Sequence, residues 1–224
     1  MKNLVRKELL LTFNPLLLIF VVGLTFLAAI PSYPKFIGLF YIYACYPIIF
    51  IGVNKGQNSN DVFYSLTLPV ERKDIVKARL ISLAILHAAM FVMQTIYFFV
   101  GLLIEKSIPP EDLVTIGFTN NAYLTMCGFS LISLGVLNLT FLPLFYRDAK
   151  SITASMIVAG LVFSIVLMVL NLALPLGFPA VSSFFDTCDF YIHIITFVIG
   201  FIIYTILNGL TYFISVKKFE KVDF

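Results

Sequence analysis

Charged residues are scarce in this chain. Only 12% of its 224 residues are Asp, Glu, Lys or Arg, whereas 60% are hydrophobic. A typical soluble domain is about half apolar and about a quarter charged, so this composition excludes a soluble globular enzyme and a disordered or acidic tail. The net charge of +3 gives no sign of a nucleic-acid partner, because the position of the charges matters more than their sum.

Patterns that catalysis and cofactor binding need are also lacking. The cysteines Cys45, Cys127 and Cys188 have no spacing typical of disulfides or a metal site, and we expect them to behave as small apolar residues. There is no His-Glu-x-x-His, no Gly-x-Ser-x-Gly and no pair of carboxylates within an apolar run. Residues 52–57 lack the Gly-Lys-Ser/Thr of a phosphate-binding loop. We therefore expect no enzymatic activity and no cofactor; ATP and magnesium would be bound by another chain.

Long apolar runs, in contrast, fill most of the chain. A helical membrane span takes about 20 apolar residues, and six runs are of that order. They are solidly apolar rather than alternating, which excludes a membrane strand barrel. The first run partly resembles a signal peptide, but Glu8 precedes it and Leu27 stands where a small residue is wanted. The sequence predicts an all-α integral membrane protein with a single domain over 1–224 and spans at 16–30, 36–53, 81–104, 123–145, 152–174 and 191–216.

Lysine and arginine predict the orientation of these spans. Of the 15 such residues, all but Lys35 and Lys106 fall in the N-terminal arm, in the loops 54–80 and 146–151, or in the C-terminal tail. The positive-inside rule places such segments in the cytoplasm. We therefore expect both termini and the long loop 54–80 on the cytoplasmic side of a plasma membrane.

Few polar side chains lie within the predicted spans. No Asp, Glu, Lys or Arg lies at membrane depth, which argues against a transporter driven by an ion gradient. The other polar groups can form hydrogen bonds between helices, or alternatively contact a substrate; they are His87, His193, Gln94, Asn138, Asn171 and Asn208.

The loop 54–80 has the most specific pattern. Residues 58–61 (Asn-Ser-Asn-Asp) favour the start of a short helix, and Pro69 would end it. Phe63 and Tyr64 on that helix suit docking into a groove of a partner protein, or a position among lipid headgroups. These residues alone leave both alternatives open.

The end of this loop resembles a known family. Residues 65–79 read Ser-Leu-Thr-Leu-Pro-Val-Glu-Arg-Lys-Asp-Ile-Val-Lys-Ala-Arg. This is similar to the Ser-Leu-Pro-x-x-Arg-x-x-Ile-x-x-x-Arg/Lys loop of bacterial type 2 ABC exporter permeases, in its Thr-Leu-Pro variant. The six spans, the basic arm and the cytoplasmic termini also match. Small permeases of this family, which this chain resembles in size, export phenol-soluble modulins or confer bacteriocin immunity.

The resemblance implies a coupling helix that is seated in a separate ATPase subunit, and an N-terminal helix that lies along the membrane surface. Two permease copies, identical or homologous, would pair with two ATPase subunits. A charged turn at 146–151 would make a second contact, or serve only as a turn. The ATPase-contacting residues implied in this way are Asp61, Val62, Phe63, Tyr64, Ser65, Leu66, Pro69, Arg72, Arg147 and Asp148.

Two other segments have patterns of their own. Ser151, Ser155 and Ala159 recur every four residues, a spacing that allows close helix approach within the bundle or at a dimer seam. The segment 175–190 is rich in proline, glycine and phenylalanine, and we expect it to dip into the outer leaflet of the membrane.

The expected substrate class rests on the resemblance more than on composition. Phenylalanine occurs 24 times and tyrosine 11 times; an aromatic wall suits amphipathic peptides or lipid-like molecules, or alternatively these residues only fill a bundle that faces the bilayer. The sequence therefore predicts the membrane subunit of a bacterial ATP-driven peptide exporter, in toxin export or self-immunity. The alternatives are an ABC exporter of lipids or drugs, and a channel or scaffold unrelated to ABC transporters.

Overall fold

The computed structural model describes residues 2–12, 65, 67, 69–109, 122–147 and 152–221. Within these ranges the regular structure is helical throughout, as the sequence predicts. The helices are α1 (Lys2–Thr12), α5 (Arg72–Glu105), α6 (Tyr123–Arg147), α7 (Ile152–Met168), the π-helix η4 (Val169–Ala173), α8 (Leu174–Gly177), α9 (Pro179–Thr187) and α10 (Phe190–Phe219).

Three of these helices are long and apolar enough to cross a membrane: α5, α6 and α10. They have 34, 25 and 30 residues, against the ~20 that a bilayer requires. They cover the predicted spans at 81–104, 123–145 and 191–216. A shorter apolar helix, α7, continues without a break through η4 and α8, and this covers the predicted span at 152–174. The predicted spans at 16–30 and 36–53 lie outside the described residues.

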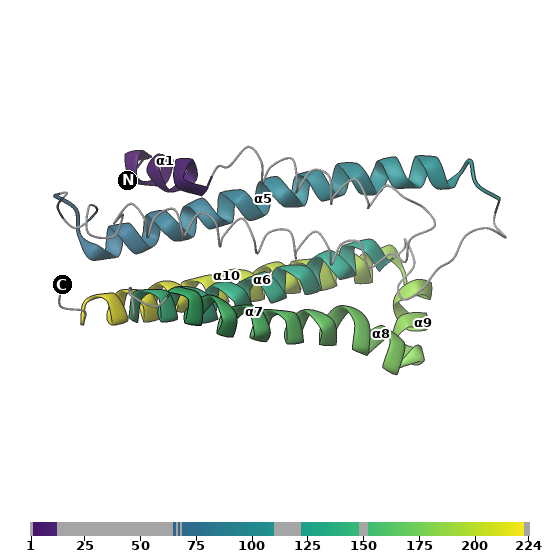
Figure 1. Cartoon of the computed structure of the whole chain (residues 1–224). Helices are drawn as coiled ribbons and strands as arrows, with labels where there is room; N and C mark the ends of the chain where they lie inside the picture. The colour runs from purple at the N-terminus through teal and green to yellow at the C-terminus, as the bar shows by residue number, and fades with distance from the viewer. Residues whose placement is uncertain are drawn as a thin grey trace.

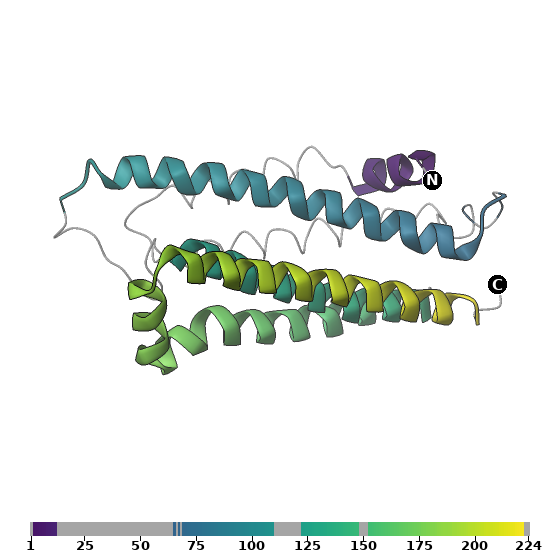
Figure 2. The same ribbon diagram turned by 180° about the vertical axis from the view of Figure 1, so that it is seen from behind.

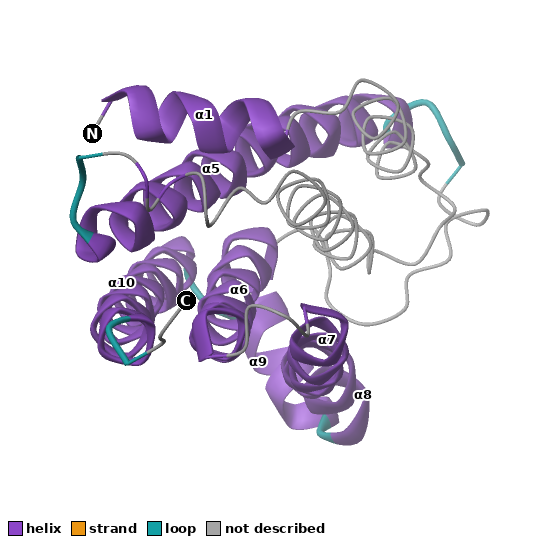
Figure 3. Cartoon of the chain, turned by 60° about the vertical axis from the view of Figure 1, so that its left-hand side comes forward, coloured by secondary structure: helices purple, strands orange, loops and turns teal. Residues whose placement is uncertain are grey.

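These long helices form a bundle whose ends differ. In Figure 1, α5 begins where α6 and α10 end, and both chain termini lie at that same end, while α9 crosses the opposite end. Figure 2 shows α10 lying along α6. Figure 3 shows α1 against α5, on the side away from α7. We call the end with the termini the basic end, because it carries Arg72, Lys73, Arg147, Lys217 and Lys218.

The contact between α6 and α10 depends on glycine. A Cβ atom added to Gly200 would lie 2.5 Å from the carbonyl oxygen of Gly128, and one added to Gly128 would lie 2.9 Å from the Thr196 carbonyl oxygen. Any larger side chain would therefore push the two backbones apart. Small residues at a helix crossing allow this close approach in membrane bundles, where van der Waals packing replaces the hydrophobic effect between helices.

Interior polar groups of the bundle bond across helices, as one of the two sequence alternatives predicts. His87 Nδ1 lies 3.0 Å from the hydroxyl of Tyr204, which joins α5 to α10. Asn138 Nδ2 donates to Asn208 Oδ1 over 2.8 Å, which joins α6 to α10. Near the α9 end, His193 Nδ1 lies 2.9 Å from Thr125 Oγ1.

The segment after α8 has a markedly apolar surface. Phe178 is 64% exposed and Phe184 is 52% exposed, on or next to the short helix α9. Phe185 instead packs edge-on against Phe129 of α6, with ring centroids 6.1 Å apart. Exposed phenylalanines on a helix that crosses the end of the bundle agree with the expectation that this segment enters the outer leaflet, which stays a prediction.

Candidate functional site

The residues predicted to contact an ATPase are only partly described. Residues 61–64, Leu66 and Asp148 lie outside the described residues. Ser65 is fully buried, whereas Pro69 and Arg147 are exposed. Arg72 is half-buried at the first position of α5.

Local sequence explains why α5 begins where it does. Glu71 precedes the helix in an extended conformation, with φ −78° and ψ 149°. Its carbonyl oxygen accepts a hydrogen bond from the backbone N–H of Asp74 at 2.9 Å. Asp74 also places negative charge in the first turn, where the helix dipole favours it. The start of the helix fixes which way Arg72 and Arg79, two turns apart, can point.

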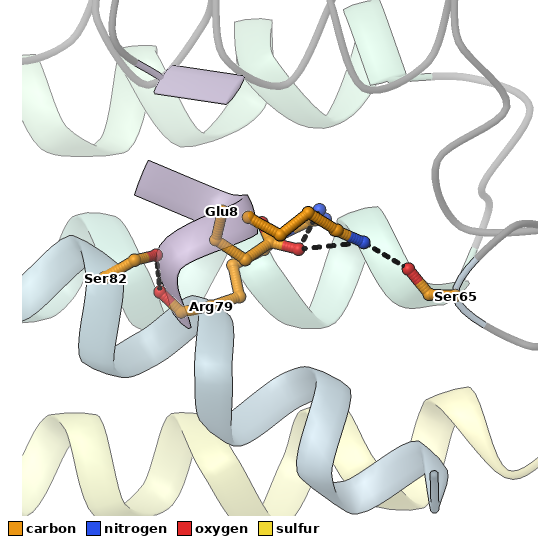
Figure 4. Close-up of polar contacts among 5 residues, drawn as sticks. Glu8, Ser65, Arg79 and Ser82 are labelled. Carbon is orange, nitrogen blue, oxygen red and sulfur yellow. Dashed lines mark hydrogen bonds and ion pairs between the residues drawn. The ribbon is translucent and has the colours of Figure 1, made fainter. Parts of the chain in front are cut away.

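A buried ion pair joins α1 to α5. Arg79 Nε donates to Glu8 Oε2 over 2.8 Å, and Arg79 Nη2 donates to Glu8 Oε1 over 3.3 Å (Figure 4). The two side chains are only 8% and 6% exposed. This two-point geometry is the strong form of an arginine–carboxylate contact. Because two directional hydrogen bonds accompany the charge attraction, the pair fixes the orientation of α1 against α5 as well as their contact.

The same arginine also contacts α6. Its guanidinium carbon lies 4.8 Å from the ring centroid of Phe145 and 5.9 Å from that of Tyr146. Cation–π contacts of this length strengthen when the groups are shielded from water, and both rings are buried. Arg79 therefore links three helices at one point.

A further contact of α1 reaches the loop itself. Lys7 Nζ donates a hydrogen bond to Ser65 Oγ, drawn in Figure 4 as the dashed line that ends at the labelled Ser65. Lys7 Nζ also lies 3.7 Å from Glu8 Oε1. The N-terminal helix therefore contacts the loop directly, in addition to its contact with α5.

The guanidinium of Arg72 points toward α10 of its own chain. Its Nη1 atom donates to the carbonyl oxygens of Phe219 over 2.7 Å and of Glu220 over 3.1 Å. The Phe219 ring lies 5.5 Å below the guanidinium carbon and 4.7 Å from the Tyr146 ring. The last carbonyls of a helix lack partners within the helix and carry partial negative charge, which a cation complements.

We call this set of residues the arginine cluster: Lys7, Glu8, Ser65, Arg72, Arg79, Phe145, Tyr146 and Phe219. Apart from Ser65 and Arg72, sequence reasoning did not select its members as site residues. Two signals were available, since Glu8 is the only acid in a basic arm and Arg79 closes the motif of the loop. The aromatic members carried no distinguishing signal.

The small-residue face of α7 is turned into the chain. Ser155 is 6% exposed and Ala159 is fully buried in the core, together with Met156 and Phe163. These two residues are therefore buried within their own chain, and a role of this face at a dimer seam stays a prediction. Ser151 lies outside the described residues.

Taken together, these features define a helical membrane protein whose charged contacts gather at one end of the bundle. Within the described ranges, no group of three or more His, Cys, Asp or Glu side chains is placed to hold a metal ion.

Residues 3–220 match the family described as ABC-2 family transporter protein. The chain therefore belongs to the ABC-2 transporter family, and it is a permease-type membrane subunit. Comparisons with curated proteins and with solved structures give no significant match.

Proposed function

We propose that this chain is the permease subunit of an ATP-driven exporter, energised by a separate ATPase chain docked on the loop 54–80. The observation that carries the proposal is the family match over 3–220. The sequence has no phosphate-binding loop, so the energy must come from a partner. In this account the chain has six spans in a bacterial plasma membrane, with both termini cytoplasmic.

Transport would follow from alternating conformations of the permease. Two permease copies, identical or homologous, would associate with two ATPase subunits. ATP binding would draw the ATPases together, displace the loops 54–80, and switch the spans between inward-open and outward-open states. The charged contacts that such a displacement would meet first are those of the arginine cluster.

Amphipathic peptides are the substrate class that we propose. The support is the aromatic composition of the chain and its resemblance to permeases that export phenol-soluble modulins. Lipid or drug export is the alternative within the same family. A flux assay in inside-out vesicles separates these: an amphipathic helical peptide should accumulate with ATP, and preference for a lipid analogue would overturn the peptide assignment.

Substitutions in the loop test the ATPase contact. Phe63→Asp and Leu66→Asp should abolish co-purification of the ATPase, because an aspartate cannot fill an apolar pocket. Thr67→Asp is the matched control, since Thr67 is helical and exposed in the same segment, and it should retain the complex. If the Phe63→Asp and Leu66→Asp proteins are inserted in the membrane and both still bind the ATPase, docking through this helix is contradicted.

A further inference from the structure

The basic residues at the start of α5 differ sharply in their surroundings. Lys73 is exposed and pairs with Glu71, and these side chains are 54% and 67% exposed. Its neighbour Arg72 is half-buried and donates to two backbone carbonyls of the α10 terminus. A lysine at position 73 suits solvent, a lipid surface or a partner protein. The Arg72 side chain, in contrast, is occupied within its own chain.

The chemistry of this contact suits an arginine. One guanidinium nitrogen donates to the carbonyl oxygens of Phe219 and Glu220, while the guanidinium carbon lies 5.5 Å from the centroid of the Phe219 ring. A planar guanidinium can bond at its edge and stack on its face at the same time, which an ammonium cannot. Charge-assisted bonds to these helix-terminal carbonyls are stronger than neutral ones. The contact therefore caps α10 with a side chain from α5.

Other contacts hold the segments around Arg72 in place. On one side of the loop, α1 is held by Ser65 and Arg79. On the other side, Phe219 packs on Tyr146 of α6. The two helices α6 and α10 are then in backbone contact along the bundle through Gly128 and Gly200. A displacement of the loop would therefore reach α10 through Arg72. From α10 it would reach α6 through the contact of Phe219 with Tyr146 and through the crossing at Gly128 and Gly200.

We propose that Arg72 is a positioning residue that ties the start of α5, where the loop ends, to the end of α10, so that α10 moves with the loop during the transport cycle. This rests on the proposed function, because an ATPase must move the loop. Arg72 then acts inside the permease rather than as a contact with the ATPase. It transmits the movement of the loop to a helix of 30 residues that extends to the α9 end of the bundle.

Distances between spin labels test this in the complex of the full chain with its ATPase. Labels are placed on cysteines substituted for Thr67, Lys221 and, as an outside reference on α7, Ile157; all three positions are exposed. The native cysteines are replaced by alanine. In the wild-type background, ATP with vanadate should change the 67–157 and 221–157 distances together, and leave the 67–221 distance unchanged.

Substitution of Arg72 should separate these movements. In Arg72→Ala the 67–157 distance should still respond to ATP, the 221–157 distance should respond by less than half, and the 67–221 distribution should broaden. Arg72→Lys should lie between the two, because it keeps the charge and loses the planar guanidinium. Lys73→Ala is the matched control and should behave as the wild type, since Lys73 is exposed beside Glu71.

Two results would overturn the inference. One is a 67–221 distance that changes with ATP in the labelled protein that keeps Arg72. The other is an Arg72→Ala protein in which all three distances behave as in the wild type. If Arg72→Ala does not fold, Arg72→Lys and the wild-type distances still decide. If the proposed function is wrong, no ATPase will co-purify with the wild-type chain, which is a separate result. The distribution of 67–221 distances in the isolated permease, compared between wild type and Arg72→Ala, then still reports whether Arg72 holds the loop to α10.

Discussion

Replacement of Gly200 by alanine should weaken the bundle at the crossing of α6 and α10. The new Cβ would lie 2.5 Å from the Gly128 carbonyl oxygen and 2.6 Å from the Gly128 Cα, whereas ordinary contact begins near 3.4 Å. The helices must therefore separate by about 0.9 Å, the difference between 3.4 and 2.5 Å. A gap of that size forfeits roughly a quarter to a half of each contact's attraction along the seam.

The magnitude follows from two opposing terms. Overpacking of this kind costs about 1–3 kcal/mol, and alanine regains up to ~1 kcal/mol of helix propensity. With the alanine contribution taken in full, the net loss is up to about 2 kcal/mol, which corresponds to a fall in Tm of up to roughly 4–8 °C in a chain of this size. The assay is thermal unfolding of the purified protein in mild detergent, followed by size-exclusion fluorescence.

Gly209→Ala is the matched control on the same helix. A Cβ at Gly209 would meet no atom within 4 Å, so this variant should keep its Tm or raise it through helix propensity. Equal Tm values for the Gly200 and Gly209 variants would refute the close packing of α6 and α10. A larger loss for the Gly209 variant would do so as well.

Other predictions concern the basic end and the orientation of the chain. Glu8→Gln and Arg79→Gln should each cost about 3–5 kcal/mol, because each removes one partner of a buried, two-point ion pair. The double variant should cost clearly less than the sum of the two; strict additivity in thermal unfolding would show that the side chains do not interact. Glu71→Gln, which breaks an exposed pair, should leave stability unchanged. A membrane-impermeant maleimide should label Cys188 of the native chain on intact cells. It should label a Thr67→Cys variant, with the native cysteines replaced by alanine, only after permeabilisation; the reverse pattern would invert the orientation.

The long helices could be predicted from the sequence because a bilayer fixes their length. The apolar runs at 81–104, 123–145 and 191–216 each lie within one helix of the structure. The helices exceed the runs mainly at the basic end, where α5 begins at Arg72 and α10 continues to Phe219. Hydropathy cannot detect these extensions, since they lie beyond the apolar stretch and contain charged residues.

Most contacts of the arginine cluster could not be predicted in this way. Glu8 and Arg79 are 71 positions apart, so no helical periodicity relates them. Arg72 bonds to backbone carbonyls 147 and 148 positions away, and a backbone acceptor has no residue identity. Neither Gly128 nor Gly200 belongs to a recognisable motif, and only the packing of α6 against α10 shows that the two glycines face each other.

Isolation of the tagged chain from its native host in mild detergent tests the central claim most directly. We expect a stoichiometric partner that contains a Gly-x-x-x-x-Gly-Lys-Ser/Thr loop, identified by mass spectrometry of the purified complex. ATP hydrolysis by that complex should depend on the presence of the permease. Isolation of the intact chain without any ATPase, under conditions that preserve other membrane complexes of the same cells, would contradict the account.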